Sequence, residues 1–304
     1  MIARTHTPFA LVFAVLSGCT ILMPAAPTRI EHEPRAFGIA DARVPIEVAL
    51  VLSGGSARGF AHIGVIKALE HSGIRPGLVV GTSAGSIVGA LYAAGMNASE
   101  LEDAAKRADD SLLGDYTLSL SSLGLVRGER LREFVNTEAK HRLIEQFPIR
   151  FAAVSTDLRS GDLVAFNRGD AGQAVRASAA IPGVFEPARI SGRLYVDGGL
   201  VSPLPVTTAR TMGARLVIAV DVAYPPSGNA ITSPLAVMYQ TFLIQTYRLK
   251  ELERPFADIV IAPVMRTDGQ LGFSDRAELI AAGEDAARAA LPRIRALLSA
   301  TTTR

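Results

Sequence analysis

Apolar and polar positions follow two patterns along the chain, and these patterns predict strands and helices in turn. Continuous apolar runs such as 48–52 predict strands buried on both faces. Phe60, Ile63, Ile66 and Leu69 recur at three-residue steps, close to the apolar stripe of a helix. The predicted strands cover 44–53, 77–82, 151–158, 163–167, 193–199, 215–222 and 257–264. The predicted helices cover 60–70, a segment directly after residue 83, 128–143, 171–181, 234–252 and 275–299. This alternation predicts an α/β fold whose parallel or mostly parallel sheet is covered on both faces.

One segment, residues 109–128, follows neither pattern. Its sequence DDSLLGDYTLSLSSLGLVRG has no clear helical or strand period. Two interpretations stay open for it: a flexible loop over a functional site, or a packed irregular connection.

The N-terminus has the layout of a signal peptide. Arg4 precedes the apolar stretch Pro8–Leu16, and the sequence LSGC then ends at Cys19. The stretch is shorter than the ~18–20 residues needed to cross a bilayer. LSGC resembles the bacterial lipobox, which implies cleavage before Cys19 and its diacylation; a secretory signal with a chance cysteine is the alternative.

These features predict three parts of the chain. Residues 1–18 are expected to be a lipoprotein signal peptide, and 19–43, which mix prolines and charges without a period, a tether. Residues 44–304 are expected to form the folded domain. Thr20 is not the acidic residue associated with inner-membrane retention, so we expect a lipid-anchored protein of the bacterial cell envelope, at the outer membrane facing the periplasm. Cys19 is the only cysteine, which excludes an internal disulfide.

Composition narrows the class of protein. Apolar residues make up 49% of the chain and charged residues 20%, with a formal net charge of +2. This balance excludes a disordered tail and gives no reason to expect nucleic-acid binding. No acidic cluster has the spacing of calcium ligands, and no metal or cofactor is expected.

The stretch VVGTSAGSIVGAL, 79–91, contains the pattern G-x-S-x-G at Gly81, Ser83 and Gly85. It follows a predicted buried strand and precedes a predicted helix, the context of a nucleophile elbow that exposes a serine hydroxyl on a tight turn. Bulky neighbours would collide in such a turn, which favours the two glycines. The alternative is that Ser83 only caps the helix.

The loop SGGSARGF, 53–60, places Gly54, Gly55 and Gly59 between a strand and a helix. It lacks the G-K-[ST] ending of a P-loop and the G-x-G-x-x-G spacing of a dinucleotide site, which argues against nucleotide binding. An oxyanion hole built from backbone N–H groups is the other interpretation. Arg58 either adds positive charge there or forms a surface ion pair.

No histidine is placed as an obvious base for Ser83. His62, about one turn into the predicted helix after the loop, is the only histidine close to a motif. A carboxylate is the natural alternative, and Asp197 ends a predicted strand at the edge where sites of parallel sheets form. A plain turn at DGG is the other explanation. Asp157 and Asp221 also follow apolar runs and are fallback bases, with His62.

Taken together, SGGSARGFAHIGVIKALE, GTSAGSIVGALYAAG, ASAAIPGVFEP (177–187) and VDGG resemble the patatin-like phospholipases, in the expected order and over roughly Val44 to Asp221. The resemblance implies a three-layer α/β/α fold, lipid acyl hydrolase activity and a Ser-Asp dyad. By matching positions, Ser83 is the nucleophile, Asp197 the base, and Gly54, Gly55, Arg58 and Gly59 the oxyanion loop. Ser56 departs from the pattern, because such families often have a third consecutive glycine there.

The substrate stays open at this stage. The resemblance implies a membrane lipid or another acyl ester as the substrate. An esterase or thioesterase acting on soluble acyl substrates would use the same residues, and a catalytically inactive envelope scaffold is a different class of function.

Overall fold

The computed structural model describes residues 32–38, 46–108, 115–116, 123–223, 225–226, 231–265 and 273–302. All of these lie in one compact unit, His32–Arg304. Cys19 and the expected signal peptide 1–18 lie outside the described residues, so lipid anchoring and its location stay predictions. Among the described residues, no helix is both long enough and apolar enough to span a membrane.

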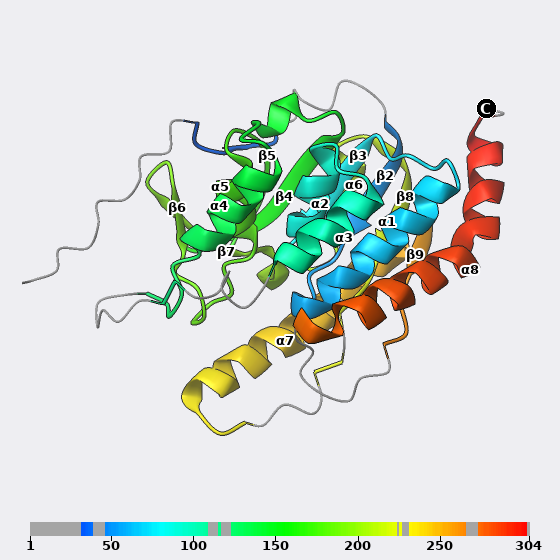
Figure 1. Cartoon of the computed structure of the whole chain (residues 1–304). Coiled ribbons are helices and arrows are strands. Elements are labelled where there is room, and N and C mark those ends of the chain that lie inside the picture. The colour runs from blue at the N-terminus through cyan, green and yellow to red at the C-terminus, as the bar shows by residue number, and fades with distance from the viewer. Residues whose placement is uncertain are drawn as a thin grey trace, which may run out of the picture. The chain divides into compact units, whose positions relative to one another are not determined.

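The described residues form a nine-stranded mixed sheet whose central strands are parallel (Figure 1). Its main path runs through β1 (Arg35–Ala36), β5 (Leu163–Arg168), β4 (Arg150–Asp157), β3 (Leu78–Thr82), β2 (Ile46–Leu52), β8 (Ala214–Val220) and β9 (Ile259–Ile261). The pairs from β4 through β3, β2 and β8 to β9 are parallel. Strand β7 (Arg193–Asp197) pairs antiparallel with β4 and with β6 (Ala188–Ile190), and β5 pairs antiparallel with β4 and β1. The predicted α/β class with a mostly parallel central sheet is therefore confirmed.

Two apolar clusters cover the faces of this sheet and give three layers. Because side chains alternate along a strand, Leu50 enters one cluster and its neighbour Val51 the other. The larger cluster includes residues of α1 (Ala61–His71), α2 (Ala84–Ala93), α3 (Ala98–Arg107), α4 (Glu129–Glu138), α5 (Ala171–Ser178) and α8 (Arg276–Thr302). The smaller cluster includes residues of α6 (Val206–Thr211). The remaining helix is α7 (Pro234–Glu253), and short 3-10 turns are η2 (Ser56–Phe60), η4 (Ile144–Gln146), η5 (Gly198–Leu200), η6 (Arg254–Phe256) and η7 (Phe273–Asp275).

Some element boundaries differ from the predictions. The helix predicted over 128–143 ends at Glu138 as α4, because Lys140 and His141 adopt positive φ angles of 57° and 53° that a right-handed helix does not permit. Helices α3 and α6 were not predicted. Of the irregular segment 109–128, the structure describes 115–116 and 123–128, where Val126 forms isolated bridges to Tyr116 and Phe185.

The folded body begins before residue 44. Strand β1 pairs with β5, the Phe37 N–H donates to the Ala165 carbonyl at 2.7 Å, and the Asp170 N–H donates to the His32 carbonyl at 2.8 Å. Part of the segment predicted as a tether over 19–43 is thus paired with the sheet. This pairing provides hydrogen-bond partners for backbone groups at the edge of the sheet. A strand of two residues is too short to show a pattern of apolar positions in the sequence.

Helices α1 and α8 lie side by side (Figure 1), and two glycines allow their close approach. A Cβ on Gly64 would lie 1.8 Å from the Ile280 carbonyl oxygen, and one on Gly283 would lie 1.9 Å from the Ala61 carbonyl oxygen. Both contacts are with backbone, so neither can be relieved by turning a side chain. The long C-terminal helix therefore packs on the first helix of the fold through a contact that admits no side chain at these positions.

We expect Gly64→Ala to destabilise the fold by about 1–3 kcal/mol, because the added methyl group forces α1 and α8 apart. This cost exceeds the gain of up to about 1 kcal/mol from the better helix propensity of alanine. Urea unfolding followed by circular dichroism measures the difference. Gly77→Ala is the control, since a Cβ there meets Ile46 at an ordinary 3.5 Å. Equal stability of Gly64→Ala and the control would contradict the packing argument.

Candidate active site

Ser83 lies on a strained turn between β3 and α2. Its backbone angles are φ 53° and ψ −123°, and its side chain makes no capping hydrogen bond to the helix. The alternative that Ser83 only caps α2 is therefore not supported. Ser83 is largely buried, with 8% of its surface exposed. A non-glycine residue in this conformation costs roughly 1–3 kcal/mol, and such strain is concentrated at functional sites.

Gly81 and Gly85 are required by the geometry of this turn. A Cβ on Gly81 would lie 2.4 Å from the Gly85 carbonyl oxygen, and one on Gly85 would lie 2.2 Å from the Leu52 carbonyl oxygen. Both glycines therefore let the start of α2 pack directly on the ends of β2 and β3. The predicted reason for the two glycines, steric crowding, matches these contacts.

Ser178 supports the turn from the end of α5. The Ser83 N–H donates to Ser178 Oγ at 3.0 Å, and Ser178 Oγ donates to the Val154 carbonyl at 2.6 Å. This buried hydroxyl links α5, β4 and the turn, and it orients the backbone of Ser83. Ser178 was not predicted as a site residue, although it lies in the stretch ASAAIPGVFEP.

Asp197 ends β7 at the same edge of the sheet. Its N–H donates to the Ala180 carbonyl at 2.9 Å, and its carbonyl accepts the Thr156 hydroxyl at 2.8 Å. The carboxylate oxygen Oδ1 accepts the Gly199 N–H at 2.7 Å. Three polar contacts to three different segments are not needed for a plain surface turn, and Asp197 is fully buried. The turn at DGG therefore holds a carboxylate inside the protein.

The structure brings Ser83 and Asp197 together. Burial raises the pKa of Asp197 to about 7, and the interactions of its carboxyl with the Ser83 hydroxyl and the Gly199 N–H only partly oppose this rise. The contact with Ser83 is close enough to bear on the pKa, yet Oδ2 of Asp197 has no partner with full hydrogen-bond geometry. A hydroxyl rotates about its C–O bond, so the Ser83 O–H can turn toward Oδ2 without a change in the backbone. Oδ2 is thus available to accept a proton.

The glycine loop lies directly against the turn. A Cβ on Gly54 would lie 3.3 Å from Ser83 Cβ, and one on Gly59 would lie 2.7 Å from Ala84 Cβ. Of the residues predicted to form the oxyanion loop, Gly54 and Arg58 have backbone amides that are bonded to other groups, and the positive charge of Arg58 stays a prediction. The Gly54 N–H donates to the Pro203 carbonyl at 3.0 Å and the Arg58 N–H to the Gly55 carbonyl at 3.1 Å, so both amides are engaged elsewhere.

Gly55 and Ser56 stand at the start of the 3-10 turn η2. Gly55 is its N-cap, and the first hydrogen bond of the turn is made by Arg58. The first amides of a helix have no partner within it, so those of Gly55 and Ser56 are the better-placed donors. Ser56 has a φ of 50°, a value that favours glycine, so the departure noted in the sequence puts a serine in a strained backbone conformation. Gly59 serves close packing against α2.

The fallback bases have other partners. Asp157 accepts N–H groups of Arg159 and Ser160 at 2.9 and 3.0 Å, and Arg193 Nε at 2.6 Å. Burial alone would raise the pKa of Asp157, but these hydrogen bonds and the Arg193 charge lower it overall. Asp157 also lines a cavity of about 490 Å³ whose lining includes neither Ser83 nor Asp197. Asp157 is therefore a structural anion.

Asp221 and His62 are also held in place. Asp221 forms ion pairs with Lys250 at 2.9 Å and Arg254 at 3.3 Å. His62 Nε2 lies 2.9 Å from the Ser53 carbonyl oxygen, and burial lowers the pKa of His62 to about 4, with partial opposition from that hydrogen bond. A neutral, buried imidazole bonded to the loop backbone supports the loop rather than facing the Ser83 hydroxyl. Within the described part of the chain, no group of three or more His, Cys, Asp or Glu side chains could hold a metal ion.

The fold and these residues define an α/β protein with a nucleophile elbow and a buried carboxylate beside it. The chain belongs to the patatin-like phospholipase family, whose model matches residues 50–210. An uncharacterized NTE family protein of Mycobacterium tuberculosis is 39% identical over 197 residues, 65% of this chain and 54% of that protein. Patatin-like phospholipase domain-containing protein 6 of Mus musculus is 34% identical over 226 residues, 72% of this chain and 16% of that protein.

Among solved structures, VipD from Legionella pneumophila has a similar fold, with a TM-score of 0.52 and 14% identity. The match covers 87% of this chain and 70% of VipD. At this identity the likeness shows the fold alone. The chain spans about half the length of the mycobacterial relatives it matches. The comparisons therefore give the family and the three-layer fold, as the sequence motifs predicted.

We expect Asp197→Asn to stabilise the fold, and more so at pH 8 than at pH 5. Asp197 titrates at about 7 when folded and near 3.8 when unfolded. The folded state thus binds more protons between these values, so the free energy of unfolding falls as the pH rises through this window. The neutral amide of asparagine avoids that loss, and its advantage should grow by about 2–3 kcal/mol between pH 5 and 8.

Urea unfolding of both chains at the two pH values measures this difference. Asp162→Asn, at an exposed aspartate, is the matched control and should gain nothing between pH 5 and 8. An Asp197→Asn advantage that does not change with pH would show that the buried carboxyl has an ordinary pKa.

Proposed function

We propose that the chain is a serine acyl hydrolase that cleaves acyl esters of membrane lipids, including phospholipids, through Ser83 and Asp197. The observation that carries the proposal is the fully buried Asp197 carboxyl, whose pKa is raised to about 7 beside the Ser83 hydroxyl. A general base is most effective when its pKa is near the working pH. An ordinary aspartate would be too weak a base for this role.

In the first step, the Asp197 carboxylate takes the proton of Ser83 as Oγ attacks the ester carbonyl carbon. The electron pair of the carbonyl π bond moves to the carbonyl oxygen, which becomes the oxyanion of a tetrahedral intermediate. When this intermediate collapses, the bond to the leaving alcohol breaks, and the alcohol takes the proton from Asp197. The product is an acyl group on Ser83 and a free alcohol such as a lysophospholipid.

The oxyanion is proposed to bind the amides of Gly55 and Ser56. Their place at the start of η2, against the Ser83 turn, supports this assignment. The N-terminus of α2, which begins at Ala84, lies in the same region, and the positive end of its helix dipole adds to the stabilisation of the oxyanion. Removing one such donor typically costs ~3–4 kcal/mol of transition-state stabilisation.

In the second step, Asp197 activates a water molecule, which attacks the acyl-enzyme. The water proton passes to Asp197, the C–O bond to Ser83 breaks, and Ser83 recovers its proton from the carboxyl. A fatty acid leaves, and both groups return to their starting states. One carboxyl therefore serves as base and acid in each half of the cycle.

The lipid substrate class is supported by the family, and the same dyad could act on soluble esters or thioesters. A panel of phospholipids, lysophospholipids and short p-nitrophenyl esters separates these functions. Hydrolysis restricted to the soluble esters would remove lipids as the substrate class. Hydrolysis of none of them would favour the inactive scaffold.

We expect a fluorophosphonate probe to label the wild-type chain and to leave Ser83→Ala unlabelled, because the probe reacts only with an activated serine.

Asp197→Asn should lose at least 10³-fold in kcat, because its side chain cannot take the proton, while KM changes little. Gel fluorescence and ester hydrolysis are the measurements.

Ser160→Ala, at an exposed serine, and Asp157→Asn are the controls. Labelling that persists in Ser83→Ala would move the nucleophile to another serine. A loss of turnover in Asp157→Asn, with full turnover in Asp197→Asn, would move the base to Asp157.

A further inference from the structure

The burial pattern of helix α7 is the reverse of that of an ordinary surface helix. Its buried residues are the charged Lys250 and Glu253, whereas large apolar side chains face solvent. Residues 231–247 contain no Asp, Glu, Lys, Arg or His. Four side chains in this charge-free segment are about half exposed: Ile231 at 58%, Val237 at 52%, Met238 at 54% and Ile244 at 46%. A soluble helix normally directs its apolar side chains inward, so this face is built to contact something else.

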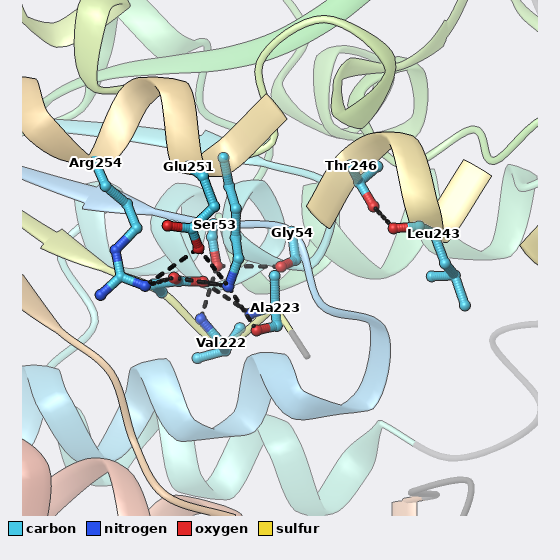
Figure 2. Close-up of polar contacts among 10 residues, drawn as sticks. Ser53, Gly54, Val222, Ala223, Leu243, Thr246, Glu251 and Arg254 are labelled. Atoms are coloured by element: carbon cyan, nitrogen blue, oxygen red, sulfur yellow. Dashed lines mark hydrogen bonds and ion pairs between the residues drawn. The ribbon is translucent and has the colours of Figure 1, made fainter. Parts of the chain in front are cut away.

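The C-terminal end of α7 is fixed to the protein by buried charges. Lys250 Nζ donates to both oxygens of Asp221, at 3.2 and 2.9 Å, and to the Ala223 carbonyl at 3.0 Å. Figure 2 shows that Arg254 approaches the same cluster, next to Ser53 and Val222. The Val222 N–H donates to Ser53 Oγ at 2.9 Å, which joins this cluster to the glycine loop.

A second anchor lies less than one turn further along the helix. The carboxylate of Glu253 accepts the Ser202 hydroxyl at 2.5 Å and both the N–H and the hydroxyl of Thr207, at 2.8 and 2.9 Å. Loss of the partners of Lys250 or of Glu253 would leave a buried charge without compensation, which is costly in free energy. The apolar half of α7 is therefore held in a set direction, and in Figure 1 it extends beyond the other labelled helices.

The charge-free half of α7 lies beside the candidate active site. A Cβ on Gly199, two residues after Asp197, would lie 2.9 Å from Thr246 Cγ2 and 3.1 Å from the Phe242 ring. The Gln245 side chain donates to the Leu200 carbonyl at 2.8 Å. Further toward its N-terminus, α7 contacts the segment after α5, where a Cβ on Gly183 would lie 3.0 Å from Leu235 Cδ1.

The apolar surface continues past Gly183 onto a neighbouring segment. The Leu125 N–H donates to the Val184 carbonyl at 2.9 Å, which places residues 123–126 next to 183–185. Leu123 and Leu125 are 63% and 49% exposed. Exposed apolar side chains thus lie on two segments that both contact residues 183–184.

The polar side chains in the charge-free half would tolerate a dry environment. Gln240 donates to the Pro226 carbonyl at 2.7 Å, and Thr241 donates to the Val237 carbonyl at 2.9 Å. Thr246 donates to the Leu243 carbonyl at 2.9 Å (Figure 2). Transfer of these three groups out of water therefore keeps one hydrogen bond from each, and the usual cost of burying a polar group is reduced.

We propose that residues 231–247 and the exposed leucines of 123–125 form a docking surface for the interface of a phospholipid membrane. This inference rests on the proposed function, because a lipid substrate lies in a membrane and the docking surface borders Asp197. A segment without charges enters the acyl boundary with no ion to desolvate, and the anchors at Lys250 and Glu253 keep the active site at a set height above it. A lipid then reaches Ser83 without crossing open water.

The test uses the absence of tryptophan from the chain. Val237→Trp places a single fluorescent reporter on the docking surface, and Leu252→Trp places one at a 68% exposed site about 22 Å further along the helix. Both full-length chains are mixed with phosphatidylcholine vesicles that carry bromine on their acyl chains. We expect emission from Val237→Trp to shift to shorter wavelength and to be quenched at least twofold, and emission from Leu252→Trp to stay unchanged.

Ile244→Trp, two turns from Val237, repeats the test if the first variant folds poorly, with the same expected result. No quenching of either reporter, or equal quenching of Leu252→Trp, overturns the proposal. A shift that depends on protein concentration without vesicles also overturns it and indicates a second copy of the chain as the partner. Quenching without fluorophosphonate labelling of Ser83 would support docking and refute the hydrolase, so the two failures are distinguishable.

Discussion

The buried carboxylate of Asp197 is the constraint on which the site depends. Water is excluded from it, and the Gly199 N–H is its one donor from the backbone. Burial raises its pKa to about 7, and its few hydrogen-bonding partners only partly oppose this rise, which suits the proposed role of Asp197 as the base for Ser83. Asp157 is equally buried but has three donors, one of them cationic, and its pKa is lowered. Because their surroundings differ, Asp197 is suited to the proposed role of base, whereas Asp157 is a structural anion.

The close approach of backbone segments makes this environment possible. Gly81, Gly85 and Gly198 each stand where a Cβ would lie within 2.4 Å of a carbonyl oxygen, so three strand ends and the start of α2 meet without intervening side chains. The charged end of α7 connects to the same region through Asp221 and Ser53. The candidate site, the proposed oxyanion loop and the proposed docking surface are therefore parts of one packed edge.

The sequence predicted the main strands and most helices because they carry long apolar patterns. Helix α3 was missed although the Asn97 and Glu100 capping box was present as a signal, and α6, with six residues, is too short to show a period. Asp197 could be singled out from the VDGG motif at a strand end, but the parallel-sheet reason was wrong: β7 is antiparallel to β4, and Asp197 lies opposite Ser155 of β4. The engagement of the Gly54 amide with Pro203 could not be predicted, since that contact joins residues 149 positions apart. The partners of Lys250 depend on the tertiary fold in the same way.

The rate constant for phosphonylation of Ser83, measured across pH 5 to 9, tests the central claim most directly because it requires no knowledge of the natural substrate. If Asp197 is the base, the rate constant rises through a midpoint of about 7 and levels off above it, and Asp197→Asn reacts slowly without that transition. A rate constant that is level from pH 5 upward, or the same transition in Asp197→Asn, would contradict the assignment of Asp197 as the group that deprotonates Ser83.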